Sequence, residues 1–334
     1  MPLAVVRDLA ARRMPATPEQ IELFEVDVLA GFILARASSG LVDSSIRGDV
    51  GHLDHVRTWF GRPLWEMEPE DADFYFARVM REAAQMTKIM RAQAITTYFA
   101  FLDLRYAVEL HALTGLTVQC PIDEMNRPRG QRVGSLRIPP TAAEMQRLFA
   151  GWRESLLTCR KYRVAARSYA MARLMEKVGP RVNETCQLDL TDVHWELGRF
   201  GKLHIRAGKG SRGSGARQRM TPLINGADVL LRWYIEDIWG LFGDDPYRLR
   251  APLFLSERHN RDCSCMRLTD DGFRDALALA ALEFLPSWAG RLTPHVLRHY
   301  CASQLYLSGM DLLAVQELRG HVWITARSFG AAPP

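Results

Sequence analysis

The sequence has few of the features that would place a chain in a membrane or outside the cell. Its six cysteines are scattered, and only Cys263 and Cys265 lie close together, so neither a disulfide framework nor a metal site is predicted. No apolar run approaches membrane-spanning length. The N-terminus also lacks the apolar core and cleavage pattern of a signal peptide. We therefore expect free thiols in a reducing cytoplasm, with no membrane and no metal involved.

The composition is that of a globular protein with a mildly basic balance. Hydrophobic residues make up 48% of the 334 residues and charged residues 24%, the formal net charge is +5, and the pI is about 9.0. This length is sufficient for two domains with buried cores. The positive charge is compatible with nucleic acid as a partner but does not identify it.

The first part of the chain is expected to form a helical domain, residues 18–120, after a loose basic arm at residues 1–17. Apolar residues recur at helical spacing through most of this stretch. Gly48 and Gly51 are expected to interrupt the first helical run. A further helix is predicted to begin at Pro69, where proline and acidic residues occupy the first turn.

A linker and a second domain are predicted to follow. Residues 121–140 are rich in arginine, proline and glycine, a composition that is typical of a linker. Thr141 and Glu144 have the spacing of a capping box, which marks the first helix of a second domain at residues 141–334.

A segment near the C-terminus carries side chains that suit a phosphate. Thr293 is a good N-cap and Pro294 suits the first helical position, so a helix is predicted from there to a stop at Gly309. His295 and Arg298 share one face of its first turns, where free N–H groups favour an anion. The planar guanidinium of Arg298 matches phosphate oxygens in pairs. Such a pair alone is more often part of an ordinary solvated helix.

The residues that follow make the segment more specific. A second short helix is predicted from Asp311 to about Leu318, and Gly320 then lets the backbone turn before His321. The whole segment resembles the C-terminal signature of the tyrosine recombinases, also called the phage integrase family. The residues that match are His295, Leu297, Arg298, His299, Ala302, Ser303, Gly309, Leu318, Gly320 and His321. Arg319 departs from the pattern, because the family usually has an apolar residue there.

Two upstream residues occur in the order that the resemblance implies. Arg181 stands in a G-x-R-x-x-E stretch that ends at Glu184. Lys209 lies in a G-K-G turn, after residues 203–208, whose alternating pattern predicts one strand of a hairpin. Residues 217–223 are predicted to form the return strand.

The resemblance implies a mainly α fold with a small β-hairpin (α+β), in which a helical core-binding domain precedes a recombinase catalytic domain. It implies a site-specific recombinase or integrase for DNA strand exchange, of the kind that phages and other mobile elements use. Double-stranded DNA would be the partner, a homotetramer on DNA the working assembly, and no cofactor would be needed.

The resemblance also implies the roles of five residues around one backbone phosphate. Arg181 and Arg298 would bind the two non-bridging oxygens, and His321 would donate a further hydrogen bond. Lys209 would protonate the leaving 5′ oxygen, and His295 would serve as general base or proton carrier.

Further basic residues are candidates for contacts to the DNA backbone. They lie in the helical domain, in the linker and at the start of the second domain, and a solvated surface explains them about as well. These candidates are Lys88, Arg91, Arg127, Arg129, Arg132, Arg137, Arg160 and Lys161.

The tyrosine that attacks the phosphate in this family has no counterpart in the sequence. The pattern expects it at position 330, which is Gly330, and Phe329 lacks a hydroxyl. Tyr300 and Tyr306 are the nearest tyrosines, and packing on a helix face is the simpler role for both. The chain as written is therefore expected to be inactive alone. A truncated or frameshifted reading frame is the explanation we favour, ahead of a tyrosine donated in trans or an inactive relative.

Two other functions share some of these features. A non-catalytic DNA-binding protein that occupies or regulates recombination sites would need the same residues without the chemistry. A metal-dependent hydrolase would use His295, His299 and His321, but Val296 stands where the H-E-x-x-H motif requires glutamate.

Overall fold

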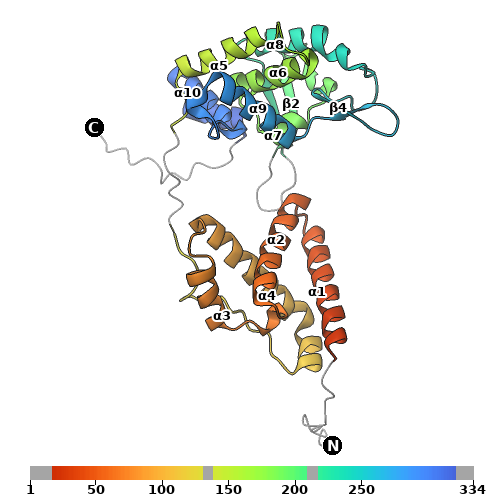
Figure 1. Ribbon diagram of the computed structural model, residues 1–334. Helices are drawn as coiled ribbons and strands as arrows, with labels where there is room; N and C mark the ends of the chain where they lie inside the picture. Colours follow the sequence, from red (N-terminus) through yellow and green to blue (C-terminus); the bar gives the residue numbers. More distant parts are fainter. Residues whose placement is uncertain (1–16, 131–137, 209–216, 321–334) are drawn as a thin grey trace, which may run out of the picture. The chain divides into compact units, whose positions relative to one another are not determined.

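The structure is a computed structural model that describes residues 17–130, 138–208 and 217–320. It divides into two compact units, Met1–Leu136 and Arg137–Pro334. The fold is mainly helical with two small antiparallel sheets, which confirms the predicted α+β class (Figure 1). No helix in the described ranges is both long enough and apolar enough to cross a bilayer.

The first unit is a group of helices around an aromatic core. Its elements are α1 (Pro18–Ser38), α2 (Asp43–Phe60), η1 (Leu64–Glu66), α3 (Pro69–Phe74), the π-turn η2 (Tyr75–Val79) and α4 (Gln85–Thr114). Phe32 of α1 meets Tyr98 and Phe101 of α4 edge to face, and both Phe32 and Tyr98 are buried. These aromatic side chains therefore hold the helices together.

The expected break at Gly48 and Gly51 was wrong, because both residues lie inside α2. The chain turns earlier, at Gly40, which has a φ of +80°. Glycine lowers helix stability by about 1 kcal/mol at each position. Burial of Leu53 and Val56 on the inner face of α2 outweighs that cost, since each fills the core of the unit.

Part of the predicted linker packs on the first unit. Ile122 is buried in the core of that unit. The Asp123 carboxylate accepts backbone N–H groups of the following turn, and the Gln85 side chain donates to the carbonyl of Arg129 at 2.7 Å. Residues 121–130 are therefore held to the helices rather than free.

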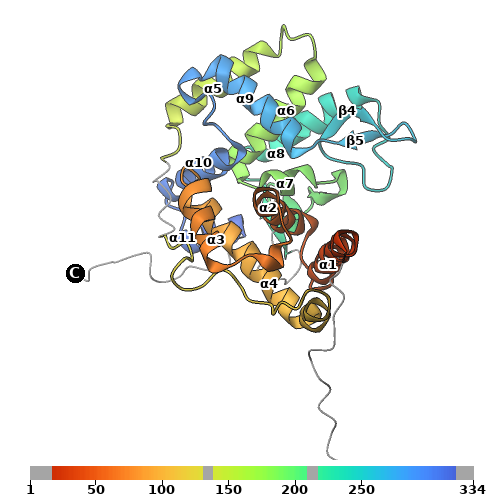
Figure 2. The same ribbon diagram turned by 60° about the horizontal axis from the view of Figure 1, so that its bottom comes forward.

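The second unit surrounds one central helix, α6. Its helices are α5 (Ala142–Ser155), α6 (Tyr162–Val178), α7 (Val182–Cys186), η3 (Leu190–Asp192), α8 (Ala227–Trp233), η4 (Tyr234–Ile238), η5 (Trp239–Phe242), α9 (Asp270–Phe284), η6 (Pro286–Trp288), α10 (Pro294–Leu307) and α11 (Leu312–Arg319). Figures 1 and 2 both show α10 beside α6, and the two helices pack together.

Two small sheets complete this unit. β1 (Val193–His194), β2 (Lys202–Gly208) and β3 (Arg217–Pro222) form one antiparallel sheet, and β4 (Leu255–His259) pairs with β5 (Cys265–Arg267). The predicted hairpin corresponds to β2 and β3, in which Ile205 stands opposite Arg219. Leu203 and Ile205 are buried, so the apolar face of the hairpin packs on the core.

The helices predicted near the C-terminus form where the capping signals placed them. The Thr293 side chain accepts the N–H of Val296 at the start of α10, and Gly309 has a φ of +89° just after its end. Asp311 caps α11, and Gly320 ends it with a φ of +64°. These two positive φ values explain the glycines, because other residues adopt them at a cost.

Candidate phosphate-binding site

Arg298 is held by the ends of two other helices. Its side chain is only 2% exposed. Nη1 donates to the carbonyl of Gly179, which ends α6, and Nη2 donates to the carbonyl of Arg319, which ends α11, at 2.5 Å. Carbonyls at helix C-termini lack partners within their own helix. The guanidinium satisfies both and is fixed in one geometry as a result.

Arg181 lies close by, because it caps α7 directly after Gly179 and Pro180. Its Nη1 donates to Glu184 Oε1 at 2.6 Å, and its backbone N–H donates to Oε2 at 2.9 Å. The same carboxylate accepts both Nη2 and Nη1 of Arg219 from β3, at 2.6 and 3.1 Å. Burial alone would raise the pKa of Glu184, but the hydrogen bonds from Arg219 and Arg181 outweigh it and lower that pKa.

Four arginines and one glutamate make up this site, which we call the α7–α10 cluster: Arg181, Arg219, Arg298, Arg319 and Glu184. Burial, followed by the positive charges of Arg181 and Arg319, lowers the pKa of Arg298 to about 9. Arg298 bonds the carbonyl of Gly179, two residues before Arg181, so α10 is held beside the start of α7 although the two arginines are far apart in sequence. Positive charge in excess of negative charge suits an anion with several oxygens.

His295 and His299 lie on the same helix as Arg298. His295 is exposed and His299 half-buried. Their Nε2 atoms are 2.9 Å apart, and the rings meet edge to face with centroids 4.4 Å apart. His295 thus lies one turn before Arg298, on the accessible side of α10. The other predicted site residues, Lys209 and His321, lie outside the described residues, as do Arg132 and Arg137.

Arg91 does not lie where a contact to DNA would require it. Its side chain is buried in the first unit, and Nη1 donates to the Tyr75 hydroxyl at 2.7 Å. We therefore remove Arg91 from the candidate DNA contacts, because its charge is used inside the fold. Lys88 is half-buried and donates to the carbonyl of Arg81 at 3.1 Å.

The other candidates in the described ranges are exposed. Arg127 and Arg129 follow α4 on the surface, and Arg129 donates to the carbonyl of Glu124 at 2.5 Å. Arg160 and Lys161 precede α6, and Lys161 forms an ion pair with Glu257 at 2.9 Å. All four side chains are accessible to a phosphate, although the Lys161 ammonium already has one carboxylate beside it.

Sequence reasoning missed two members of the α7–α10 cluster. No role was predicted for Arg219 of the hairpin, although it bonds Glu184 and donates through Nε to the carbonyl of Leu318 at 3.3 Å. Arg319 stood out only as a departure from the family pattern. No local sequence pattern pointed to Arg219; in the structure, a Cβ atom at Gly320 would stand 2.9 Å from its Nη1.

The two tyrosines of α10 differ in exposure. Tyr300 is buried in the core of the second unit, where burial raises its pKa. Tyr306 is 60% exposed. Tyr300 therefore has the packing role that its helical position indicated. Within the described ranges, no group of three or more His, Cys, Asp or Glu side chains is arranged to hold a metal ion.

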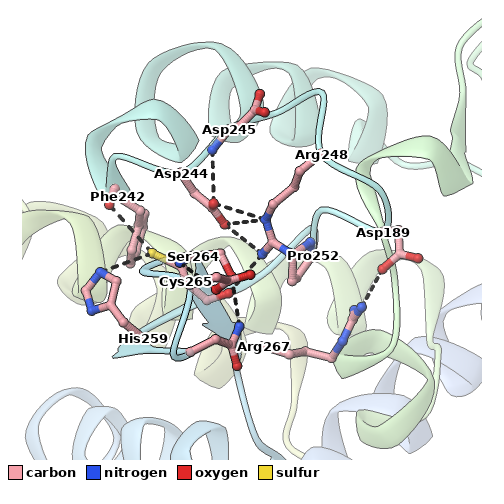
Figure 3. Close-up of polar contacts among 12 residues, drawn as sticks. Asp189, Phe242, Asp244, Asp245, Arg248, Pro252, His259, Ser264, Cys265 and Arg267 are labelled. Carbon is pink, nitrogen blue, oxygen red and sulfur yellow. Dashed lines mark hydrogen bonds and ion pairs between the residues drawn. The ribbon is translucent and has the colours of Figure 1, made fainter.

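A cavity of about 500 Å³ lies beside α7, lined by residues that include Asn183, Gln187, Arg248, Arg267 and Asp270. Figure 3 shows that two of its arginines already have partners. Arg248 forms an ion pair with Asp244 at 2.7 Å, and Arg267 forms one with Asp189. Each of these two arginines has its own carboxylate partner, whereas in the α7–α10 cluster Arg181 and Arg219 share the one carboxylate of Glu184.

Comparison with known proteins agrees with these features. Residues 146–326 match the phage integrase family. The chain is 34% identical over 166 residues to the tyrosine recombinase XerD of Oceanobacillus iheyensis, which covers 49% of each protein. It is 26% identical over 317 residues to the tyrosine recombinase XerC of Herpetosiphon aurantiacus, covering 92% of this chain and 88% of that one. The chain thus spans about half the length of the XerD relative.

Two solved structures show the same fold. One is the Tn1549 transposon integrase in complex with circular intermediate DNA, with a TM-score of 0.59, 16% identity, and coverage of 90% of this chain and 92% of that one. The other is the XerH site-specific recombinase bound to its difH substrate, with a TM-score of 0.59, 17% identity and coverage of 93% of each chain.

Proposed function

The chain belongs to the phage integrase family, and on this basis we propose that it is a DNA-binding site-specific recombinase. In this proposal the second unit holds one DNA backbone phosphate between the guanidinium groups of Arg181 and Arg298. The observation that carries it is that Arg298 of α10 bonds the carbonyl of Gly179, two residues before Arg181, in a cluster where arginines outnumber acids. A backbone phosphate supplies the two non-bridging oxygens that such a pair binds.

The chemistry would be strand exchange without an outside energy source. The attacking tyrosine, which has no counterpart at position 330 of this sequence, would lose its proton to a general base and attack the phosphorus. The bond to the 5′ oxygen would break, a phosphotyrosyl link would form, and the 5′ hydroxyl would leave with a proton from a general acid. Arg181 and Arg298 stabilise the charge that builds on the phosphate oxygens. We assign proton donation to Lys209, a further hydrogen bond to His321, and the role of proton carrier to His295.

Binding along the duplex would use the exposed basic residues outside the cluster. We assign backbone contacts to Arg127 and Arg129 after the helical domain (18–120), and to Arg160 and Lys161 before α6. Arg132 and Arg137 of the linker (121–140) stay candidates from the sequence, and so does Lys88. In this proposal residues 1–17 form a basic arm, and residues 141–334 form the catalytic domain.

We further propose a homotetramer on two DNA duplexes, acting in the cytoplasm. Support comes from the fold, because a lambda integrase tetramer bound to a Holliday junction has a TM-score of 0.58 to this chain at 15% identity. The Tn1549 integrase is a transposon protein, which makes a mobile element a reasonable source for this chain.

A nicked suicide duplex tests the activity directly. Because position 330 is Gly330, the protein alone should form no adduct with DNA. Together with a tyrosine-bearing family member whose own phosphate-binding arginines are replaced, it should give an adduct that survives denaturing gel electrophoresis, and Arg298→Met should give none. A protein that merely occupies recombination sites would shift the same duplex in a native gel yet leave no adduct, even when a tyrosine-bearing family member is added to supply the hydroxyl in trans. Absence of any DNA binding would contradict both functions.

A further inference from the structure

We propose that Arg319 is a third guanidinium ligand of the bound phosphate, beside Arg181 and Arg298. This inference rests on the proposed function, since it concerns the same phosphate. It goes beyond the family pattern, which has an apolar side chain at this position. Three observations carry it: the burial of Arg319, the balance of charge around it, and the way its backbone is tied to Arg298.

The first observation is that Arg319 is buried without enough partners. The residue is only 9% exposed. Its Nε is buried and has no hydrogen-bond partner among the described residues. A buried N–H that lacks an acceptor costs free energy, and a charged one costs more. An apolar side chain would avoid that cost, so a guanidinium here favours a ligand that brings an acceptor.

The second observation is the charge of the α7–α10 cluster. Its only carboxylate, Glu184, already accepts hydrogen bonds from Arg181 and Arg219 through both oxygens. The parts of the second unit outside the described residues, 209–216 and 321–334, contain no Asp or Glu. Their side chains therefore offer no negative charge to neutralise Arg298 and Arg319, and an anion from outside would do so.

The third observation is the position of the Arg319 main chain. Its carbonyl accepts Nη2 of Arg298 at 2.5 Å, and the carbonyl of Leu318 accepts Nε of Arg219 at 3.3 Å. The last turn of α11 is thus fixed to two members of the cluster. Burial lowers the pKa of Arg319, and the neighbouring charge of Arg181 lowers it further. The backbone of Arg319 is therefore held in a fixed position relative to Arg298, which we propose as a phosphate ligand.

The variant Arg319→Met separates the side chain from the main chain. Methionine fills a similar volume and leaves the carbonyl that Arg298 needs. We would measure the unfolding temperature at pH 7 in inorganic phosphate and in sodium chloride at equal ionic strength. In the wild-type protein, phosphate should raise it in proportion to binding. Arg319→Met should weaken the apparent phosphate affinity about tenfold or more, and Arg319→Lys should fall between the two.

The measurement in chloride distinguishes a ligand from a structural residue. Removal of one of several buried like charges should leave the chloride unfolding temperature of Arg319→Met unchanged or higher, whereas a structural role would lower it. Arg258→Met, at an exposed arginine of β4, is the matched control and should respond to phosphate as the wild type does.

Each outcome decides between the two proposals. If Arg319→Met keeps the full response to phosphate while Arg181→Met loses it, the role of Arg319 is wrong and the phosphate site stands. If Arg319→Met is less stable in chloride and keeps its phosphate affinity, Arg319 is structural. If the wild-type protein shows no response specific to phosphate, the phosphate site itself fails, and the inference with it.

Discussion

The second unit contains two arginine clusters that differ in their number of acidic partners. In the first, Arg206 and Arg267 bind Asp189 and Asp192, and both aspartates are buried. We call this group the Asp189 cluster, and Figure 3 shows its Asp189–Arg267 pair. The α7–α10 cluster holds four arginines and one carboxylate, that of Glu184, which pairs with Arg181 and Arg219.

The difference indicates which cluster serves a ligand. Buried ion pairs with equal numbers of charges are complete within the fold, and they hold segments such as η3 and β2 together. Buried arginines that outnumber the carboxylates around them repel one another, and this repulsion lowers the stability of the protein without a bound ligand. The ratio of arginine to carboxylate, rather than the presence of arginine, therefore separates a structural cluster from a candidate binding site.

Substitution of Arg298 should have the largest effect. Arg298→Met removes the proposed phosphate ligand and leaves the carbonyls of Gly179 and Arg319 without their donor. We therefore expect both loss of DNA cleavage and destabilisation by about 2–4 kcal/mol. Urea denaturation and the adduct assay would measure the two. Arg298→Lys should also fail to cleave, since an ammonium cannot reproduce the paired geometry. Wild-type behaviour of Arg298→Lys would contradict the assignment.

Substitution of Glu184 should destabilise the protein, because Glu184 is the one carboxylate that offsets the positive charge of the α7–α10 cluster. Glu184→Gln leaves Arg181 and Arg219 without a carboxylate and should destabilise the protein by about 2–3 kcal/mol. The lowered pKa of Glu184 also sets a pH dependence. A carboxyl with a lowered folded pKa stabilises the protein above its unfolded pKa of about 4.3, and that contribution disappears as pH falls through the folded value. Stability curves below pH 5 should therefore flatten in Glu184→Gln.

Substitution of Asp189 should damage stability without affecting the ligand. Asp189→Asn leaves Arg206 and Arg267 short of one partner in a buried site, and we expect a loss of about 2–3 kcal/mol. The rise in unfolding temperature that phosphate causes should stay at its wild-type size. A variant with normal stability and lost phosphate binding would reverse our interpretation of the two clusters.

Substitution of Lys161 should have the smallest effect. The side chain is exposed and paired with Glu257, and exposed pairs contribute little to stability. Lys161→Met should therefore unfold close to the wild-type temperature while DNA affinity falls by a few-fold and the salt slope decreases by about one. Fluorescence anisotropy at several salt concentrations would measure this. An unchanged slope would mean that Lys161 does not touch the backbone.

The sequence predicted those features that depend on neighbours along the chain. Thr141 and Thr293 begin helices because a side-chain oxygen caps the residues directly after them, and such signals are local. The continuity of α2 was missed because burial of Leu53 overrides the glycines inside the helix. Arg91 was taken for a surface residue, since nothing near it in sequence indicates the buried hydroxyl of Tyr75.

The residues of the candidate site also differ in whether a local sequence pattern could identify them. Arg181 and Arg298 could be named from their motifs, and the structure brings them together, while their roles stay predictions. The bond from Arg219 to Glu184 joins residues from different elements, so no local pattern contains it. The same holds for Arg319, whose significance depends on which side chains surround the end of α11.

The hold of Arg298 on the last carbonyl of α11 makes the arrangement conditional. If α11 moved away from α10, the guanidinium would lose one of its two fixed acceptors and could rotate out of alignment. In the proposed function, phosphate binding by Arg298 would therefore depend on the position of α11, and a change that displaces this helix would weaken it.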